Sequence, residues 1–285
     1  MGKRRKVTHN AQPAQRSNAG GQKPQGVTRP NPQKQKQKQK QPQPQYDKPT
    51  IPFAPEDKIL LVGDGDLSFA ASLVEHHYCA DVTATVLEKN LEELVEKYPH
   101  VPENIAKIEA EDSKVLYGVD ATKMAPFADK KGKDGTGVMD RIIFNFPHVG
   151  GKSTDVNRQV RYNQELLVEF FKHAMPSLAP GGSIIVTLFE GEPYTLWNIR
   201  DLARHTGLQV ERSFKFQASA YPGYHHARTL GVVKSKSGET GGGWKGEDRA
   251  ARSYIFVRKD DDARPRPGSS KKRSRARDDE SSDDD

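Results

Sequence analysis

Residues 58–70 read Lys-Ile-Leu-Leu-Val-Gly-Asp-Gly-Asp-Leu-Ser-Phe-Ala, a short aliphatic run that ends in two closely spaced glycines. Uninterrupted runs of this kind are typical of parallel strands that are covered on both faces. Gly63 and Gly65 allow the backbone to turn sharply and to approach a bound molecule, and residues 67–78 continue with a helical pattern. The stretch predicts the first strand, loop and helix of a nucleotide-binding fold, although a strand that turns into a helix without any ligand gives the same pattern.

Strand patterns alternate with helical patterns along the next two hundred residues. Aliphatic and β-branched runs predict six further strands, at 81–87, 115–119, 140–146, 183–189, 210–216 and 253–258. Apolar residues at helical spacing predict helices over 91–98, 164–178 and 194–205, the second of them stopped by Leu-Ala-Pro-Gly-Gly at 178–182. This alternation predicts an α/β fold with a doubly wound, Rossmann-like parallel sheet. We expect residues 123–138 to form a surface insertion and residues 238–245 to form a Gly-rich insertion.

Composition divides the chain into three parts. Residues 1–50 contain twelve Lys or Arg and one acidic residue, with Gln and Lys alternating over 33–41, so we expect a disordered basic arm. Residues 260–285 carry seven basic and nine acidic residues and predict a second disordered, charged tail. Residues 51–259 have a net charge of −2, and their length suits one domain with a substantial core.

Several features of the sequence bear on location. The lone cysteine, Cys79, excludes intramolecular disulfides, and the chain shows neither a secretory signal nor an apolar run long enough for a bilayer. The basic clusters at 3–6 and 271–277 are typical of nuclear import signals, and they also suit a polyanion such as RNA. We therefore expect an intracellular protein without membrane association, located in the nucleus or nucleolus, and monomeric.

Acidic residues follow two of the predicted strands. Glu88 ends the second strand, where a carboxylate accepts hydrogen bonds from ribose hydroxyls, and Asp120 follows the third, where it suits an adenine amino group. Each acid alone also fits a helix cap or a solvated turn, but together with Gly63 and Gly65 they outline a nucleoside site. The third glycine of a dinucleotide fingerprint falls at Ser68, which disfavours nicotinamide cofactors.

Four motifs resemble those of the fungal 25S ribosomal RNA uridine-N3 methyltransferases, and the resemblance covers roughly residues 56–258. The motifs are Gly-Asp-Gly-Asp-Leu-Ser-Phe at 63–69, Gly-Val-Asp-Ala-Thr at 118–122, Phe-Asn-Phe-Pro-His-Val-Gly at 144–150 and Tyr-Pro-Gly-Tyr at 221–224. The resemblance implies a class I, S-adenosylmethionine-dependent enzyme with seven strands, the last antiparallel, that acts on large-subunit ribosomal RNA or the pre-ribosome in the nucleolus. One departure is Glu88, where the family favours aspartate.

The resemblance also implies the site residues. The cofactor set that it indicates is Gly63, Asp64, Gly65, Leu67, Ser68, Phe69, Glu88, Asp120 and Asn145. The catalytic set is Asn145, Phe146, Pro147 and His148, which is similar to the Asn/Asp-Pro-Pro-aromatic motif of amino-group methyltransferases. In uridine N3 methylation the imide proton must leave, so Asn145 is the candidate acceptor from N3–H and Phe146 a support for the base plane. His148 is either a general base or a stacking or phosphate-binding residue.

Two other function classes stay open at this point. A noncatalytic RNA-binding ribosome-assembly factor would keep the fold and the basic arms, and failure to bind S-adenosylmethionine would support it. A nicotinamide-dependent oxidoreductase is the second.

His225 and His226 suit polar loop positions near an RNA or substrate entrance, and we expect no metal, because neither a cysteine pair nor a third spaced ligand accompanies them.

Overall fold

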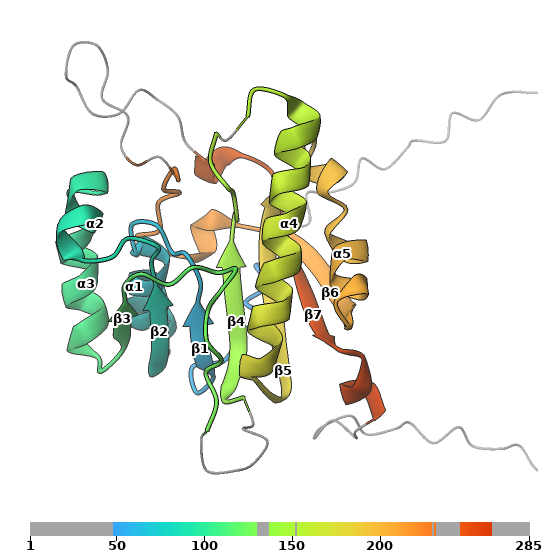
Figure 1. The fold of residues 1–285 in the computed structure, drawn as a ribbon. Helices are drawn as coiled ribbons and strands as arrows, with labels where there is room; N and C mark the ends of the chain where they lie inside the picture. The colour runs from blue at the N-terminus through green and yellow to red at the C-terminus, as the bar shows by residue number, and fades with distance from the viewer. Residues whose placement is uncertain (1–47, 130–136, 152, 230, 232–245, 264–285) are drawn as a thin grey trace, which may run out of the picture. The chain divides into compact units, whose positions relative to one another are not determined.

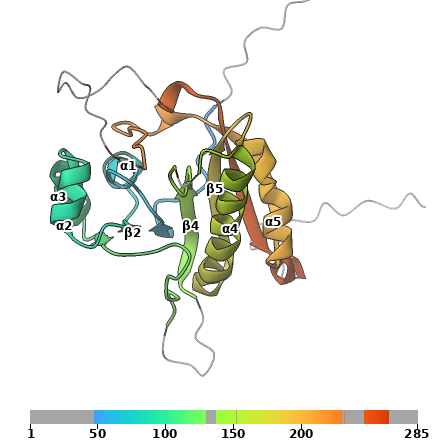
Figure 2. The same cartoon turned by 45° about the horizontal axis from the view of Figure 1, so that its top comes forward.

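The computed structural model describes residues 48–129, 137–151, 153–229, 231 and 246–263. The predicted arm over 1–50 and the predicted tail over 260–285 fall almost entirely outside the described residues, as does the Gly-rich segment 238–245. Within the described part, one sheet carries helices on both of its faces (Figures 1 and 2). None of the described helices is both long enough and apolar enough to cross a membrane.

The sheet has seven strands in the order β3-β2-β1-β4-β5-β7-β6. They are β1 (Lys58–Leu61), β2 (Asp81–Thr85), β3 (Lys114–Leu116), β4 (Met139–Asn145), β5 (Leu178–Phe189), β6 (Leu208–Phe216) and β7 (Ala251–Arg258). The first five pair in parallel, whereas β7 is antiparallel to both of its neighbours. This is the class I methyltransferase topology that the resemblance implied, and the strand order reverses between β1 and β4, where such sheets bind ligands.

Five α-helices of the described part cover the sheet. They are α1 (Ser68–His77), α2 (Leu91–Lys97), α3 (Val101–Ala110), α4 (Val156–Ala174) and α5 (Ile199–His205). Alternate side chains of the first strand enter different cores: Ile59 and Leu61 pack with α1, α2 and α3, while Leu60 and Val62 pack with α4 and α5. Since both faces of β1 are buried, its sequence is an unbroken aliphatic run. Short 3₁₀ helices lie at Met175–Ser177, Tyr194–Trp197, Ala218–Ala220, Gly246–Asp248 and Lys259–Ala263.

Two helices differ from the sequence prediction. The pattern led to no element over residues 99–113, yet α3 forms there with Pro102 in its first turn and buries Val101, Ile105 and Ile108. Proline is compatible with the first turn of a helix because its missing N–H has no partner there. The predicted helix 164–178 begins instead at Val156, since the Asp155 side chain accepts from the Arg158 N–H and caps a polar first turn.

Two other boundaries were predicted incorrectly. The helix expected over 194–205 is split at Asn198, which has a φ of 51°. The segment expected to stop a helix at 178–182 is the start of β5, although its pairing with β4 breaks between Leu178 and Ser183. The expected surface insertion at 123–138 is described only in part: Lys123, Ala125, Pro126 and Asp129 are exposed, whereas Met124 and Gly137 are buried.

Candidate functional site

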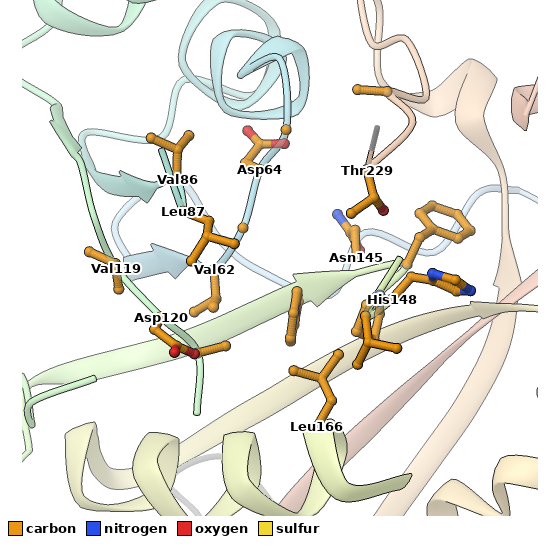
Figure 3. Close-up of a pocket in the computed structure, with 18 of the residues that line it drawn as sticks. Val62, Asp64, Val86, Leu87, Val119, Asp120, Asn145, His148, Leu166 and Thr229 are labelled. Atoms are coloured by element: carbon orange, nitrogen blue, oxygen red, sulfur yellow. The ribbon is translucent and has the colours of Figure 1, made fainter. Parts of the chain in front are cut away.

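A pocket of about 520 Å³ lies where the parallel strands end, between β1, β2, β4, helix α4 and the segment 221–229, which we call the strap (Figure 3). Nine of the twelve residues predicted for the site line this pocket. They are Gly63, Asp64, Gly65, Glu88, Asp120, Asn145, Phe146, Pro147 and His148. The fold therefore brings the predicted cofactor and catalytic groups to one cavity.

The two glycines after β1 are required for different reasons. Gly63 has a φ of +63°, a conformation that strains any other residue. Gly65 lacks that constraint, but a Cβ there would stand 2.9 Å from Cβ of Ala227 in the strap. The second glycine thus permits the strap to approach the loop, a role that the sequence pattern alone did not suggest.

The remaining predicted cofactor residues, Leu67, Ser68 and Phe69, do not line the pocket, and this corrects the predicted site. All three are at most 2% exposed. Leu67 and Phe69 are anchored in the hydrophobic core beside α1, while the Ser68 hydroxyl serves the loop itself. Their side chains support the loop after β1 without facing the pocket.

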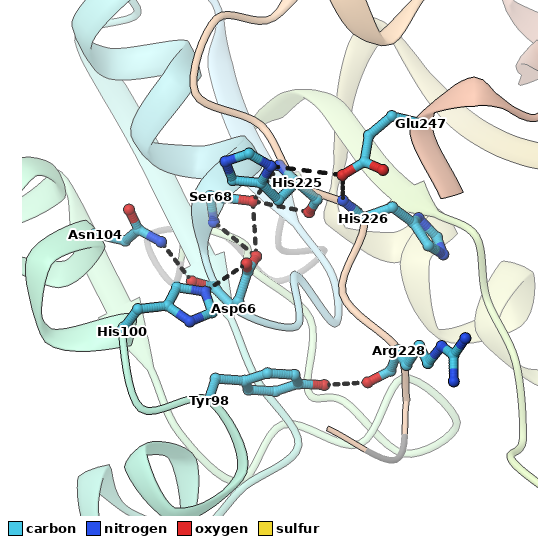
Figure 4. Close-up of polar contacts among 9 residues, drawn as sticks. All are labelled: Asp66, Ser68, Tyr98, His100, Asn104, His225, His226, Arg228 and Glu247. Carbon is cyan, nitrogen blue, oxygen red and sulfur yellow. Dashed lines mark hydrogen bonds and ion pairs between the residues drawn. The ribbon is translucent and has the colours of Figure 1, made fainter. Parts of the chain in front are cut away.

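Asp66 organises that loop (Figure 4). Its carboxylate is 4% exposed and accepts from the N–H and the hydroxyl of Ser68 at 3.1 and 2.7 Å. His100 Nε2 lies 2.9 Å from the other carboxylate oxygen, and the Asn104 amide donates to the Asp66 carbonyl. A buried carboxylate with this many partners fixes the loop after β1 against the loop and helix that follow α2.

The strap is held over the pocket through its backbone (Figure 4). Side chains from three other parts of the fold make these contacts, so the strap's path depends on its neighbours. The Ser68 hydroxyl accepts from the His225 N–H, Glu247 accepts from the His226 N–H, and the Tyr98 hydroxyl donates to the Arg228 carbonyl.

Asp64 is the most strongly perturbed acid of the pocket. Burial, and then the negative charge of Asp66, raise the pKa of the Asp64 carboxyl to about 7, although the N–H of Ala70 donates to it at 2.8 Å. A nearby cation would favour the ionised form. The carboxyl is therefore poised to respond to a positively charged ligand at neutral pH.

The acids after β2 and β3 are both engaged within the chain. Glu88 pairs with Lys97, a partner from α2 that the sequence analysis did not identify. Asp120 accepts from the N–H and the hydroxyl of Thr122, at 2.9 and 2.7 Å, with Lys123 3.8 Å away. Between them lie the apolar side chains of Val86, Leu87 and Val119, which form walls suited to a flat base.

At the end of β4 the chain turns sharply. Phe146 has a φ of 52°, unusual for a residue other than glycine, and its N–H donates to the Thr187 carbonyl at 2.8 Å. Its ring packs against Phe189, Phe216 and His226 with centroid distances of 4.5, 5.5 and 4.5 Å. Strain of this kind is concentrated at functional sites, and here it places five consecutive residues, 145–149, on the pocket wall.

The polar groups of this turn are differently satisfied. The N–H of Gly150 donates to Nδ1 of His148 at 2.9 Å, and burial lowers the pKa of the imidazole. The side-chain amide of Asn145 makes no hydrogen bond to any of the described residues, although it lines the pocket. Asn145 is thus available to a ligand.

The two neighbouring histidines of the strap have separate environments. His225 is exposed and lies 3.6 Å from Glu247. His226 is enclosed by aromatic rings, and burial lowers its pKa to about 4 despite the opposing charge of Glu247. Both line the pocket, which fits the expectation of a substrate entrance, but only His225 is a surface residue.

Sequence reasoning missed part of the wall. Helix α4 contributes four residues at helical spacing, and the region after β2 contributes two more. They are Tyr162, Glu165, Leu166, Glu169, Lys97 and Tyr98. The i, i+3, i+4, i+7 spacing on α4 was a usable signal, but the helix was predicted to start only at residue 164.

Comparisons with known proteins add to this geometry. A family model described as "rRNA (uridine-N3-)-methyltransferase BTM5-like" matches residues 60–228. The 25S rRNA (uridine(2634)-N(3))-methyltransferase of Saccharomyces cerevisiae is 30% identical over 255 residues, covering 72% of this chain and 74% of the yeast protein. The mouse ferredoxin-fold anticodon-binding domain-containing protein 1 homolog is 32% identical over 179 residues, covering 59% of this chain but 27% of the mouse protein.

Solved structures include a TehB-like SAM-dependent methyltransferase from Corynebacterium glutamicum, which is 12% identical with a TM-score of 0.40 and covers 72% of this chain and 83% of that chain. The family match includes the loops after β1 and β4 and nearly the whole strap.

Proposed function

The chain belongs to the BMT5-like family of rRNA (uridine-N3-)-methyltransferases, and on that premise we propose that it methylates N3 of a uridine in large-subunit ribosomal RNA, with S-adenosylmethionine as methyl donor. The observation that carries this proposal is the single pocket in which Gly63, Glu88 and Asp120 share a wall with Asn145 and His148. Such a cavity is required for transfer, because donor and acceptor must meet in one site.

The pocket fits a cationic nucleoside. Val86, Leu87 and Val119 provide an apolar slot for an adenine, and Asp120 lies beside it as an acceptor for its amino group. Asp64 complements the positive charge that S-adenosylmethionine carries, and Glu88, paired with Lys97, would accept from the ribose hydroxyls. Gly63 allows the sharp turn that starts this wall, because its φ is +63° and a Cβ there would stand 3.1 Å from the Phe144 ring. We assign these residues to cofactor binding.

The end of β4 would handle the target base. When bound, the cofactor supplies a methyl group on a sulfonium, an electrophile that needs no further activation by the protein. Asn145 would accept from N3–H and align the nitrogen with that methyl, while the aromatic cluster around Phe146 supports the turn. Since positioning of reactants alone contributes several orders of magnitude in rate, this alignment is the main task of the protein residues.

Nucleoside mass spectrometry of ribosomal RNA tests the proposal. RNA from cells that lack the protein should have less 3-methyluridine in the large subunit, and the purified full chain should restore it with S-adenosylmethionine. Undiminished 3-methyluridine would reject the activity. A chain that binds large-subunit RNA but shows no calorimetric signal with S-adenosylmethionine would instead identify a noncatalytic assembly factor.

We also propose a nucleolar location, supported by the basic clusters at 3–6 and 271–277. Removing residues 1–50 and 264–277 should reduce nucleolar accumulation and make RNA binding weaker and less dependent on salt, because fewer counterions are released. Fluorescence imaging and a salt titration of RNA binding measure both effects. A truncated chain that localises and binds like the full one would contradict this role of the arms.

A further inference from the structure

We propose that His148 is a neutral hydrogen-bond donor to a carbonyl oxygen of the target uracil, beside N3, and that it does not remove the N3 proton. The inference deepens the proposed function and rests on it. It starts from the hydrogen bond that the turn after β4 makes to the imidazole ring.

That hydrogen bond determines which ring nitrogen carries the proton. The Gly150 backbone N–H lies 2.9 Å from Nδ1 of His148, and a backbone N–H can only donate. Nδ1 is therefore the acceptor and has no proton, so the neutral ring carries its hydrogen on Nε2. Gly150 has a φ of 76°, and this left-handed turn directs its N–H back toward the ring.

Nε2 is the nitrogen left for a ligand. It has no hydrogen-bond partner among the described residues. In the described part, the fully buried side-chain atoms without a partner are in Ser72, Trp197 and Asp261, so Nε2 of His148 is not one of them. Because His148 lines the pocket, its Nε2–H is accessible there as a donor. Partial burial lowers the pKa of the ring and keeps it neutral near pH 7.

A donor of this kind matches the chemistry of N3. Once the N3 proton has passed to water or hydroxide, the negative charge of the uracil spreads onto O2 and O4. A donated N–H stabilises that charge without transferring its own proton. The N3 lone pair then forms the bond to the methyl carbon, the carbon–sulfur bond breaks with its electron pair on sulfur, and both products leave uncharged at these atoms. Asn145 would thus contact N3–H before the proton leaves, and His148 would hold a neighbouring carbonyl oxygen of the same base afterwards.

Two nearly isosteric variants separate a donor from a base. His148→Gln keeps an N–H donor and has no useful basicity, whereas His148→Glu supplies a base and acceptor without a donor when ionised. We expect His148→Gln to keep turnover within about 10-fold of wild type, and His148→Glu and His148→Ala to lose about 100-fold or more. Cofactor affinity by calorimetry and thermal unfolding should stay near wild type in all three.

The same assay distinguishes failure of the inference from failure of the function. Wild-type protein that forms no 3-methyluridine overturns the proposed function itself. If wild type is active, a turnover of His148→Glu equal to or above that of His148→Gln identifies a base and overturns the inference. A turnover of His148→Gln no higher than that of His148→Ala also overturns it. Wild-type turnover in His148→Ala overturns it too.

Thio-substituted RNA locates the acceptor. In an RNA that wild type methylates, 2-thiouridine or 4-thiouridine replaces one carbonyl oxygen with sulfur, a weaker acceptor. We expect one of the two thio-substituted RNAs to be methylated more slowly than the oxygen RNA by wild type. His148→Ala should methylate that thio-substituted RNA no more slowly than the oxygen RNA. A response at O4 would also explain rejection of cytosine, which has a donor amino group there. Equal effects of both thio substitutions in wild type and His148→Ala would contradict the contact.

Discussion

The loop after β1 and the end of β4 meet in one pocket but differ in whether the polar side chains that line it have partners. After β1, Asp64 accepts from the Ala70 N–H, and Asp66 accepts from Ser68 and lies within hydrogen-bond distance of His100. After β4, the Asn145 amide has no partner among the described residues. Polar groups that are satisfied internally hold a backbone in shape, whereas unsatisfied ones in a cavity are available to a ligand. We infer that the first loop is a preformed cradle and that the second is reserved for the substrate.

Substitution of Asn145 tests this comparison with the largest expected effect. Asn145→Ala should lower turnover by about 100-fold or more while cofactor affinity changes little, because the lost contact matters for the reacting nitrogen. Single-turnover methylation and calorimetry measure the two quantities. Asn90→Ala is a matched control, since Asn90 only caps α2 through the Glu93 N–H. Equal losses in turnover and cofactor affinity would place Asn145 in the cradle instead.

Asp66 tests the other loop. Asp66→Ala leaves Ser68 and His100 without their buried partner, so we expect the free energy of unfolding to fall by about 2–3 kcal/mol and cofactor affinity to fall with it. Urea denaturation and calorimetry measure these changes. Asp155→Ala, which removes the exposed cap of α4, should cost about 1 kcal/mol and leave the cofactor unaffected. If the Asp66→Ala protein is less stable but binds the cofactor normally, the hydrogen bonds of Asp66 contribute to stability and not to cofactor binding.

Substitution of Asp120 tests the proposed cofactor site, with a smaller expected effect. Asp120→Ala should weaken cofactor binding about 10-fold, the scale of one hydrogen bond, without unfolding the core, because the side chain is partly exposed. Turnover at saturating cofactor should remain near wild type. Unchanged affinity in both Asp120→Ala and Gly65→Val would reject the proposed cofactor site.

The pH dependence from Asp64 tests the loop after β1 through stability alone. Its pKa of about 7 in the folded protein exceeds the ordinary 3.8, so between these values the folded state holds a proton that the unfolded state has lost. The free energy of unfolding should therefore decrease as pH rises from about 4 to about 7, and Asp64→Asn should remove this decrease. Urea denaturation at several pH values measures it. Identical pH profiles in wild type and Asp64→Asn would show that the carboxyl is ionised in the folded protein.

Which residues line the pocket was largely predictable from the sequence, and the reason is geometrical. Parallel strands end at the same edge of a sheet, so Glu88, Asp120 and Asn145 could be placed near Gly63 once each strand was identified. Their hydrogen-bond partners could not. Lys97 reaches Glu88 only because α2 lies beside the end of β2, and Ala227 stands in front of Gly65 across 162 positions of sequence.

The helices show the same limit. An aliphatic run buried on both faces identifies β1 from its own residues, because Ile59, Leu60 and Leu61 each lie in a core. Helix α3 has only three buried side chains, Val101, Ile105 and Ile108, so its apolar pattern is weak and the packing against α1 contributes to its stability. A local sequence pattern is sufficient to identify an element whose side chains are fully buried. It is insufficient for an element whose side chains are buried only in part.

The sequence by itself determined the succession of strands along the chain, the glycine turn after β1 and the polar residues at the strand ends, since these depend on short-range periodicity and backbone freedom. Only the tertiary structure decided which of those polar groups are already used. Ser68 and Asp66 are occupied by neighbours as distant as His225 and His100, whereas Asn145 is not. Hydrogen bonds and burial depend on which segments meet in space, and that is what separates a supporting residue from one available to the substrate.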